Sequence, residues 1–179
     1  MTKNWELFQR DFLHANTWPQ RKDGVPLELL DRLSHEERAL AEDQLIEALS
    51  SGDSWPARGL GHIRSMKALP ALYALLEKCQ QDMKVNVAYA IYQVNYDRGM
   101  VDIVLAELPK IGSEYSLIDV MHLLPNFQDP RVTELLRVYR HDKRYLVAYN
   151  AARALGESTD KVVRDFLGRK AWWKIFSKD

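Results

Sequence analysis

The stretch that decides the fold runs from Leu45 to Leu155, because four segments within it align without a gap. They read LIEALSSGDSWPARGLGHI (45–63), LEKCQQDMKVNVAYAIYQV (76–94), LAELPKIGSEYSLIDVMHL (105–123) and LRVYRHDKRYLVAYNAARA (136–154). One aligned column holds Ala57, Ala88, Leu117 and Ala148, and the column twelve residues earlier holds Leu45, Leu76, Leu105 and Leu136. A period of about 30 residues that keeps one face apolar predicts stacked two-helix units, none of which can bury that face alone. The sequence therefore predicts an all-α chain built around four helix pairs.

The pairs are expected where turn residues separate helical patterns. Ser34 and Glu37 form the S-x-x-E capping box that begins the first helix. The predicted helices cover residues 36–50, 54–65, 69–79, 84–96, 100–110, 114–124, 130–140 and 143–155.

Both ends of the chain are aromatic and differ from the repeats. Trp5, Phe8 and Phe12 share one face of a helix predicted over residues 3–14, and a last helix is predicted from Asp160 to Leu167. The ends of a solenoid need an apolar cover, so residues 1–33 and 157–179 are predicted to cap a repeat region at 34–156 within one domain, 1–179. For Trp172 and Trp173 we favour capping over partner docking or a role at a membrane surface.

Composition restricts the class of protein. The chain has 179 residues, of which 46% are hydrophobic and 28% charged, values that suit a folded domain and exclude disorder. No apolar run approaches the roughly 18 residues of a membrane span, and the residues after Met1 lack a secretory signal. Cys79 is the only cysteine, so no internal disulfide can form. We expect a cytoplasmic protein.

Charge is balanced overall but unevenly placed. Residues 28–53 hold eight acidic and two basic residues, a net charge of −6, whereas residues 161–179 hold six basic and two acidic residues, a net charge of +4. Such asymmetry can steer a charged partner, although solvated helix surfaces are the simpler interpretation.

Two segments resemble a known repeat family. ALPALYALLE (68–77) followed by VAYAI (87–91), and DPRVTELL (129–136) followed by VAYNAARALG (147–156), are similar to HEAT repeats. The similarity is to the short bacterial HEAT-like repeats, which include the phycobilisome-lyase type. It extends from Glu36 to Gly156, with poorer matches where Gly59 and Gly61 interrupt the first unit and Pro125 the third.

The resemblance implies a right-handed α-solenoid of about four HEAT-like helix pairs with capping helices at both ends. It also implies that the second helix of each pair lines a concave side. Positions opposite the apolar column should then face outward and form a partner-binding stripe, rich in the aromatic and arginine residues that anchor interfaces. The stripe comprises Trp55, Arg58, His62, Asn86, Tyr89, Gln93, Tyr115, Asp119, His122, Asn150 and Arg153. For Tyr89, and for Tyr149 beside it in the alignment, half-buried packing is an equal alternative.

Catalytic patterns are not evident. The five histidines are dispersed and none forms a metal-binding HExxH motif. Cys79 lies at an apolar position, which favours a buried small side chain over a nucleophile. We therefore predict a non-enzymatic protein without catalytic, metal-binding or cofactor-binding residues.

Binding to another protein is the predicted function. A small solenoid of this kind would suit an immunity protein or inhibitor that covers the active site of a toxin, or an assembly adaptor. The alternative is a HEAT-like enzyme of the DNA glycosylase or chromophore lyase type. Duplex binding requires clustered basic residues, and the stripe offers only Arg58 and Arg153 against Asp119, so nucleic acid is not favoured as a partner.

Overall fold

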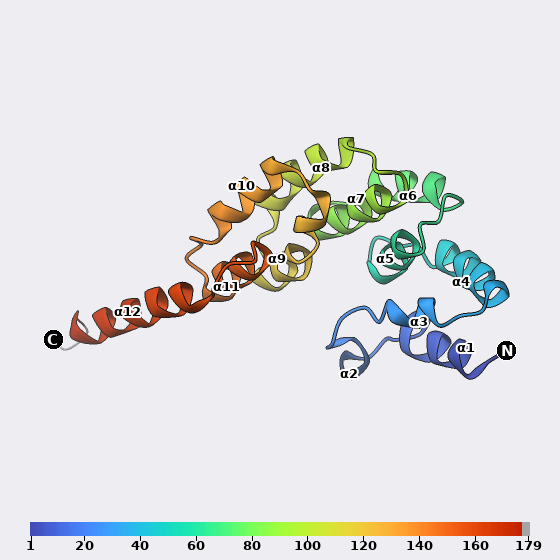
Figure 1. Cartoon of the computed structure of the whole chain (residues 1–179), viewed down its shortest axis with the longest axis horizontal. Helices are drawn as coiled ribbons and strands as arrows, with labels where there is room; N and C mark the ends of the chain where they lie inside the picture. The colour runs from blue at the N-terminus through green and yellow to red at the C-terminus, as the bar shows by residue number, and fades with distance from the viewer. Residues whose placement is uncertain (177–179) are drawn as a thin grey trace. The chain divides into compact units, whose positions relative to one another are not determined.

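A computed structural model describes the backbone of residues 1–176 and the side chains of residues 1–168. Within this part the chain forms twelve α-helices and no strands, which confirms the predicted all-α class (Figure 1). The chain divides into two compact units, residues 1–104 and residues 105–179, and each is described by itself. The prediction of one domain stays a prediction.

The N-terminal unit begins with an aromatic segment. Helix α1 (Lys3–Phe8) continues into a π-helical turn (Gln9–Leu13), and α2 (Trp18–Arg21) and α3 (Glu28–Asp31) follow. The rings of Trp5, Phe8 and Phe12 are buried, with neighbouring ring centres 5.5 Å apart. The predicted amphipathic helix is confirmed. Helix α2 lies outside all of the predicted helices.

The capping box at the start of α4 (His35–Glu47) is confirmed. The amide of Glu37 donates to Ser34 Oγ and the amide of Ser34 donates to Glu37 Oε2, each at 3.2 Å. Glu37 also accepts from the amide of Thr2 at 2.7 Å, which attaches the start of the chain to α4. These hydrogen bonds, led by the one from Thr2, lower the pKa of Glu37, since they favour the ionised carboxylate.

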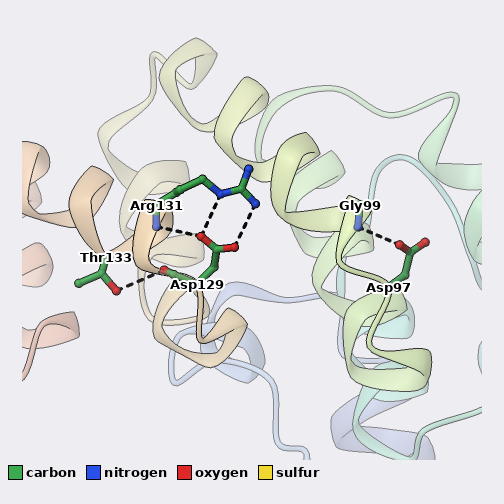
Figure 2. A network of polar contacts seen from close by, with 5 residues as sticks. All are labelled: Asp97, Gly99, Asp129, Arg131 and Thr133. Atoms are coloured by element: carbon green, nitrogen blue, oxygen red, sulfur yellow. Dashed lines mark hydrogen bonds and ion pairs between the residues drawn. The ribbon is translucent and has the colours of Figure 1, made fainter.

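Three further helices lie in the N-terminal unit. Helix α5 (Trp55–His62) packs on α4, and α6 (Leu69–Leu76) packs on α7 (Gln81–Asn95), which also lies along α5. Asp97 accepts from the amide of Gly99 at 2.9 Å, at the start of α8 (Gly99–Glu107), as Figure 2 shows. The other oxygen of Asp97 accepts from the Tyr73 hydroxyl at 2.6 Å, which fixes this start relative to α6.

The C-terminal unit is built around α11 (Tyr145–Ala154), which packs on α9 (Glu114–Met121), α10 (Pro130–Tyr139) and α12 (Asp160–Phe176). Short 3-10 turns follow α8 (Leu108–Lys110) and precede α10 (Leu124–Phe127). Asp129 caps α10, because it accepts from the amide of Arg131 at 2.8 Å and from Arg131 Nη2 at 3.0 Å (Figure 2). The final helix extends past the predicted end at Leu167, but Trp172 and Trp173, predicted to cap the fold, lie outside the described side chains.

The aligned apolar columns form the cores of both units. Ala57, Ala88, Leu117 and Ala148 are buried, as are Leu45, Leu76 and Leu136. Leu105, Ile63 and Ala154 are half-buried. The alignment therefore assigns the inward face of the helices correctly, although most helices are a few residues shorter than predicted.

Candidate functional site

The half of the predicted stripe that lies in the N-terminal unit is largely buried. Trp55, Arg58, Asn86 and Tyr89 are 6%, 8%, 1% and 9% exposed, so the expectation that they face outward is wrong. The cause at Trp55 is the N-terminal segment: the ring centre of Phe12 lies 5.9 Å from that of Trp55, and the guanidinium of Arg21 lies 4.2 Å above it. For Tyr89, the packing alternative fits its burial.

Asp53 fixes this cover on α5. It accepts from Arg21 Nη1 at 3.0 Å through one carboxylate oxygen and from the amide of Trp55 at 3.0 Å through the other. A Cβ atom added to Gly59 would lie 2.9 Å from Phe12 Cζ, so the same segment also covers α5 one turn further along. The outer face of α5 is thus an internal contact surface.

His62 and Gln93 are half-buried members of the stripe in this unit. His62 Nε2 lies 2.8 Å from Asp31 Oδ1, so the imidazole of His62 connects α5 to α3. Gln93 lies next to Gly61, where α5 and α7 approach closely. Neither residue offers a large free surface to a partner.

In the C-terminal unit four of the five predicted stripe residues are exposed, and the fifth, Asn150, is half-buried. Tyr115, Asp119 and His122 are all exposed and follow one another at intervals of four and three residues, which places them on one face of α9 and the residue after it. Leu146, Asn150 and Arg153 have the same spacing on α11, which packs against α9. We call these six residues the α9–α11 face. Leu146 was not among the candidates, although it occupies the same aligned position as Tyr115.

The α9–α11 face contains a hollow of about 310 Å³. Its lining includes three predicted stripe residues, His122, Asn150 and Arg153, together with Pro125 and Ala154. Asn150 Nδ2 donates to the carbonyl of Leu146 at 2.8 Å, a contact that orients the amide at the edge of the hollow. Pro125, which interrupts the repeat in the sequence, helps to form this wall.

Most other basic side chains of this unit are neutralised by neighbouring carboxylates. Arg137 pairs with Glu134 at 2.9 Å and Arg140 pairs with Glu157. The pair of Arg144 with Asp142, at 2.8 Å, lowers the pKa of Asp142, chiefly through its hydrogen bonds. By contrast, the Arg153 guanidinium makes no hydrogen bond or ion pair with any residue that the structure describes.

Three of the eight acidic residues in the acidic segment of the N-terminal unit, residues 28–53, also have a basic partner. Asp31 pairs with His62 and Arg38, Asp43 with Lys67, and Asp53 with Arg21. Such ion pairs favour the interpretation that these carboxylates stabilise the fold. They do not favour the alternative, in which the acidic surface steers a charged partner.

Cys79 is 3% exposed, and its burial raises the pKa of the thiol, which confirms its assignment as a buried small side chain. Among the described residues, no three or more His, Cys, Asp or Glu side chains gather in a way that could hold a metal ion. Of the helices in the described part, none has the length and apolar character to cross a membrane.

Compared with protein-family models, curated proteins and solved structures, the chain matches none of them.

Proposed function

We propose that this chain is a HEAT-like α-solenoid that binds another protein through its α9–α11 face, without catalysing a reaction. The solenoid arrangement is supported within each unit by the packing of the helix pairs α4 with α5, α6 with α7, and α10 with α11. It is also supported by the side-by-side packing of second helices, α5 with α7 and α9 with α11. Stacked helix pairs of this kind commonly present extended binding surfaces.

The observation that carries the binding function is the composition of the α9–α11 face. Tyr115 is 82% exposed, and Arg153, whose guanidinium pairs with no side chain among residues 1–168, lines a hollow. Tyrosine and arginine are enriched among the residues that dominate binding energy, because each combines apolar contact area with hydrogen bonding. The same face in the N-terminal unit is covered by its own chain, so the proposal is confined to the C-terminal unit.

The form of binding that we propose is the occlusion of a partner's functional surface, as in an immunity protein or inhibitor of a toxin; an assembly adaptor would use the same face. We propose no enzymatic role, because no cluster of described side chains favours glycosylase or lyase chemistry. A basic groove for nucleic acid is not supported either, since Arg137, Arg140 and Arg144 are each paired with a carboxylate.

Affinity capture with the full chain tests this function. Tyr115→Ala and Arg153→Gln are compared with Val138→Ala, a matched control on α10 at a residue that is also strongly exposed, and with unchanged protein. We expect one stoichiometric protein partner that the unchanged and Val138→Ala chains retain and that both variants of the face lose. Retention by both face variants, or the absence of any protein partner, would contradict the proposal.

A further inference from the structure

The strongest unassigned feature of the C-terminal unit is the positive charge in the hollow of the α9–α11 face. Arg131, Arg137, Arg140 and Arg144 each pair with a carboxylate of the same unit. Arg153 has no such partner among the described residues, and none of the described residues that line its hollow is acidic. A guanidinium so placed has five N–H donors available for a ligand.

The geometry around Arg153 suits a planar anion. Arg153 follows Asn150 by three residues, so the two side chains lie on neighbouring turns of one face of α11. One hydrogen of the Asn150 amide is used by the carbonyl of Leu146, which leaves the second hydrogen as a donor beside the guanidinium. Two parallel N–H donors of an arginine match the two oxygens of a carboxylate.

The charge of the hollow distinguishes a carboxylate from a phosphate. Arg153 is the only permanently charged cation among the described lining residues. One guanidinium balances the single negative charge of an aspartate or glutamate side chain, whereas a phosphate group carries more negative charge and is usually held by several basic groups. The volume of about 310 Å³ equals that of roughly ten water molecules at about 30 Å³ each, which accommodates an acidic side chain.

We infer that the hollow is a receptor for the carboxylate of an acidic side chain on the partner protein, with Arg153 as the bidentate anchor and the Asn150 amide as a second donor. This inference rests on the proposed protein-binding function, because it names the chemistry of the partner at that same face. Asp119 lies on the turn of α9 that precedes His122, outside the described lining of the hollow. Because its negative charge would repel further carboxylates, the site favours a single acidic side chain over an acidic cluster.

The test uses N-acetylglutamate amide as the probe and N-acetylglutamine amide as its uncharged match. Each is titrated into the full ¹⁵N-labelled chain while the Arg153 Nε–H and Asn150 side-chain NH₂ resonances are followed. We expect saturable shifts with the glutamate probe alone. Arg153→Lys should weaken binding several-fold and Arg153→Gln should abolish it, whereas Arg137→Gln, which removes an arginine that is already paired, should leave it unchanged.

Three results would overturn the inference: no shift with the glutamate probe, equal shifts with the glutamine probe, or shifts that survive Arg153→Gln. A fourth is tighter binding of inorganic phosphate at the same resonances, which would assign the hollow to a phosphate group. The outcome is separable from that of the capture experiment. A probe that binds in the absence of any protein partner would refute only the proposed function. A partner that depends on Tyr115 while the probe fails to bind would refute only the carboxylate receptor.

Discussion

Gly61→Ala tests a close contact between two helices of the N-terminal unit, α5 and α7. A Cβ atom at Gly61 would lie 2.8 Å from Ala90 Cα and 3.1 Å from Ala90 Cβ, across the interface of α5 and α7. It would also lie 2.6 Å from Gln93 Oε1, but that atom ends a flexible side chain and can move away. The Ala90 backbone cannot move without α7, so the two helices must separate by several tenths of an ångström.

Two effects of opposite sign determine the magnitude. Replacing glycine by alanine within a helix stabilises it by about 1 kcal/mol. Separating the helices weakens dispersion contacts along the interface, and overpacking of this kind typically costs about 1–3 kcal/mol. Because the contact is with backbone, the upper part of that range applies and we expect a net loss of about 1–2 kcal/mol. For a chain of this length that corresponds to a decrease in Tm of roughly 2–8 °C.

The assay is thermal and urea unfolding of matched glycine variants. Gly168→Ala, in α12 with no atom within 4 Å of the added Cβ, is the control and should be neutral or slightly stabilising. Gly59→Ala meets the side-chain atoms Phe12 Cζ and Leu45 Cδ1, which can adjust, so its cost should be smaller. Adding Ala90→Gly to Gly61→Ala should restore only part of the stability, because the contact with the Cα atom remains. A Gly61→Ala chain as stable as the unchanged protein would refute the close approach of α5 and α7.

Three further predictions concern the core, the N-terminus and the two halves of the stripe. Leu76→Ala should lower the free energy of unfolding by about 2–5 kcal/mol in urea titrations, because its side chain is buried in the core; unchanged stability would contradict the repeat register. Hydrogen bonds from Thr2 lower the pKa of Glu37 in the folded state, so its stabilisation is present at neutral pH and is lost as pH falls through that folded pKa. Glu37→Gln should accordingly flatten the stability profile below about pH 5, where the wild-type carboxylate becomes protonated, and an unaltered slope in that range would count against this attachment. Trp55→Ala should lower the free energy of unfolding by about 3–5 kcal/mol, since its indole is covered. Tyr115→Ala should change it by less than about 0.5 kcal/mol, because its side chain is exposed. A larger loss for Tyr115→Ala than for Trp55→Ala would contradict the assignment of the exposed face to the C-terminal unit.

The sequence by itself was sufficient for the elements of the fold whose causes are local or periodic. The recurrence that aligns Leu45, Leu76 and Leu136 identifies the inward side of the helices, because a helix turns by a constant angle and only one face can be apolar and buried. The start of α4 was also predictable, since the reciprocal bonds of Ser34 and Glu37 form between residues three apart. The apolar position of Cys79 in the helical pattern likewise predicted that its side chain is buried in the core.

Tertiary structure alone decided which part of the predicted stripe is exposed. Trp55 and Tyr115 occupy equivalent positions in the repeat, yet the first is covered by Phe12 and Arg21 and the second is open to solvent. The aromatic pattern at the N-terminus predicts a helix that must be buried, but it carries no information on which face of which repeat it covers. Gly59 and Gly61, which look like faults in the repeat, mark surfaces that accept this segment and α7 at close range.

The candidate site depends on tertiary structure for the same reason. His122, Asn150 and Arg153 could be proposed from their spacing, whereas the hollow that joins them also requires the turn at Pro125 and the packing of α9 on α11. Whether an arginine is neutralised by a carboxylate, as Arg140 is by Glu157 seventeen residues away, depends on contacts between segments that are distant in the sequence. Periodicity determines the inward face of each helix because burial follows from the pattern of a single helix. The availability of an outward side chain for binding is determined by which distant segments of the chain lie over it.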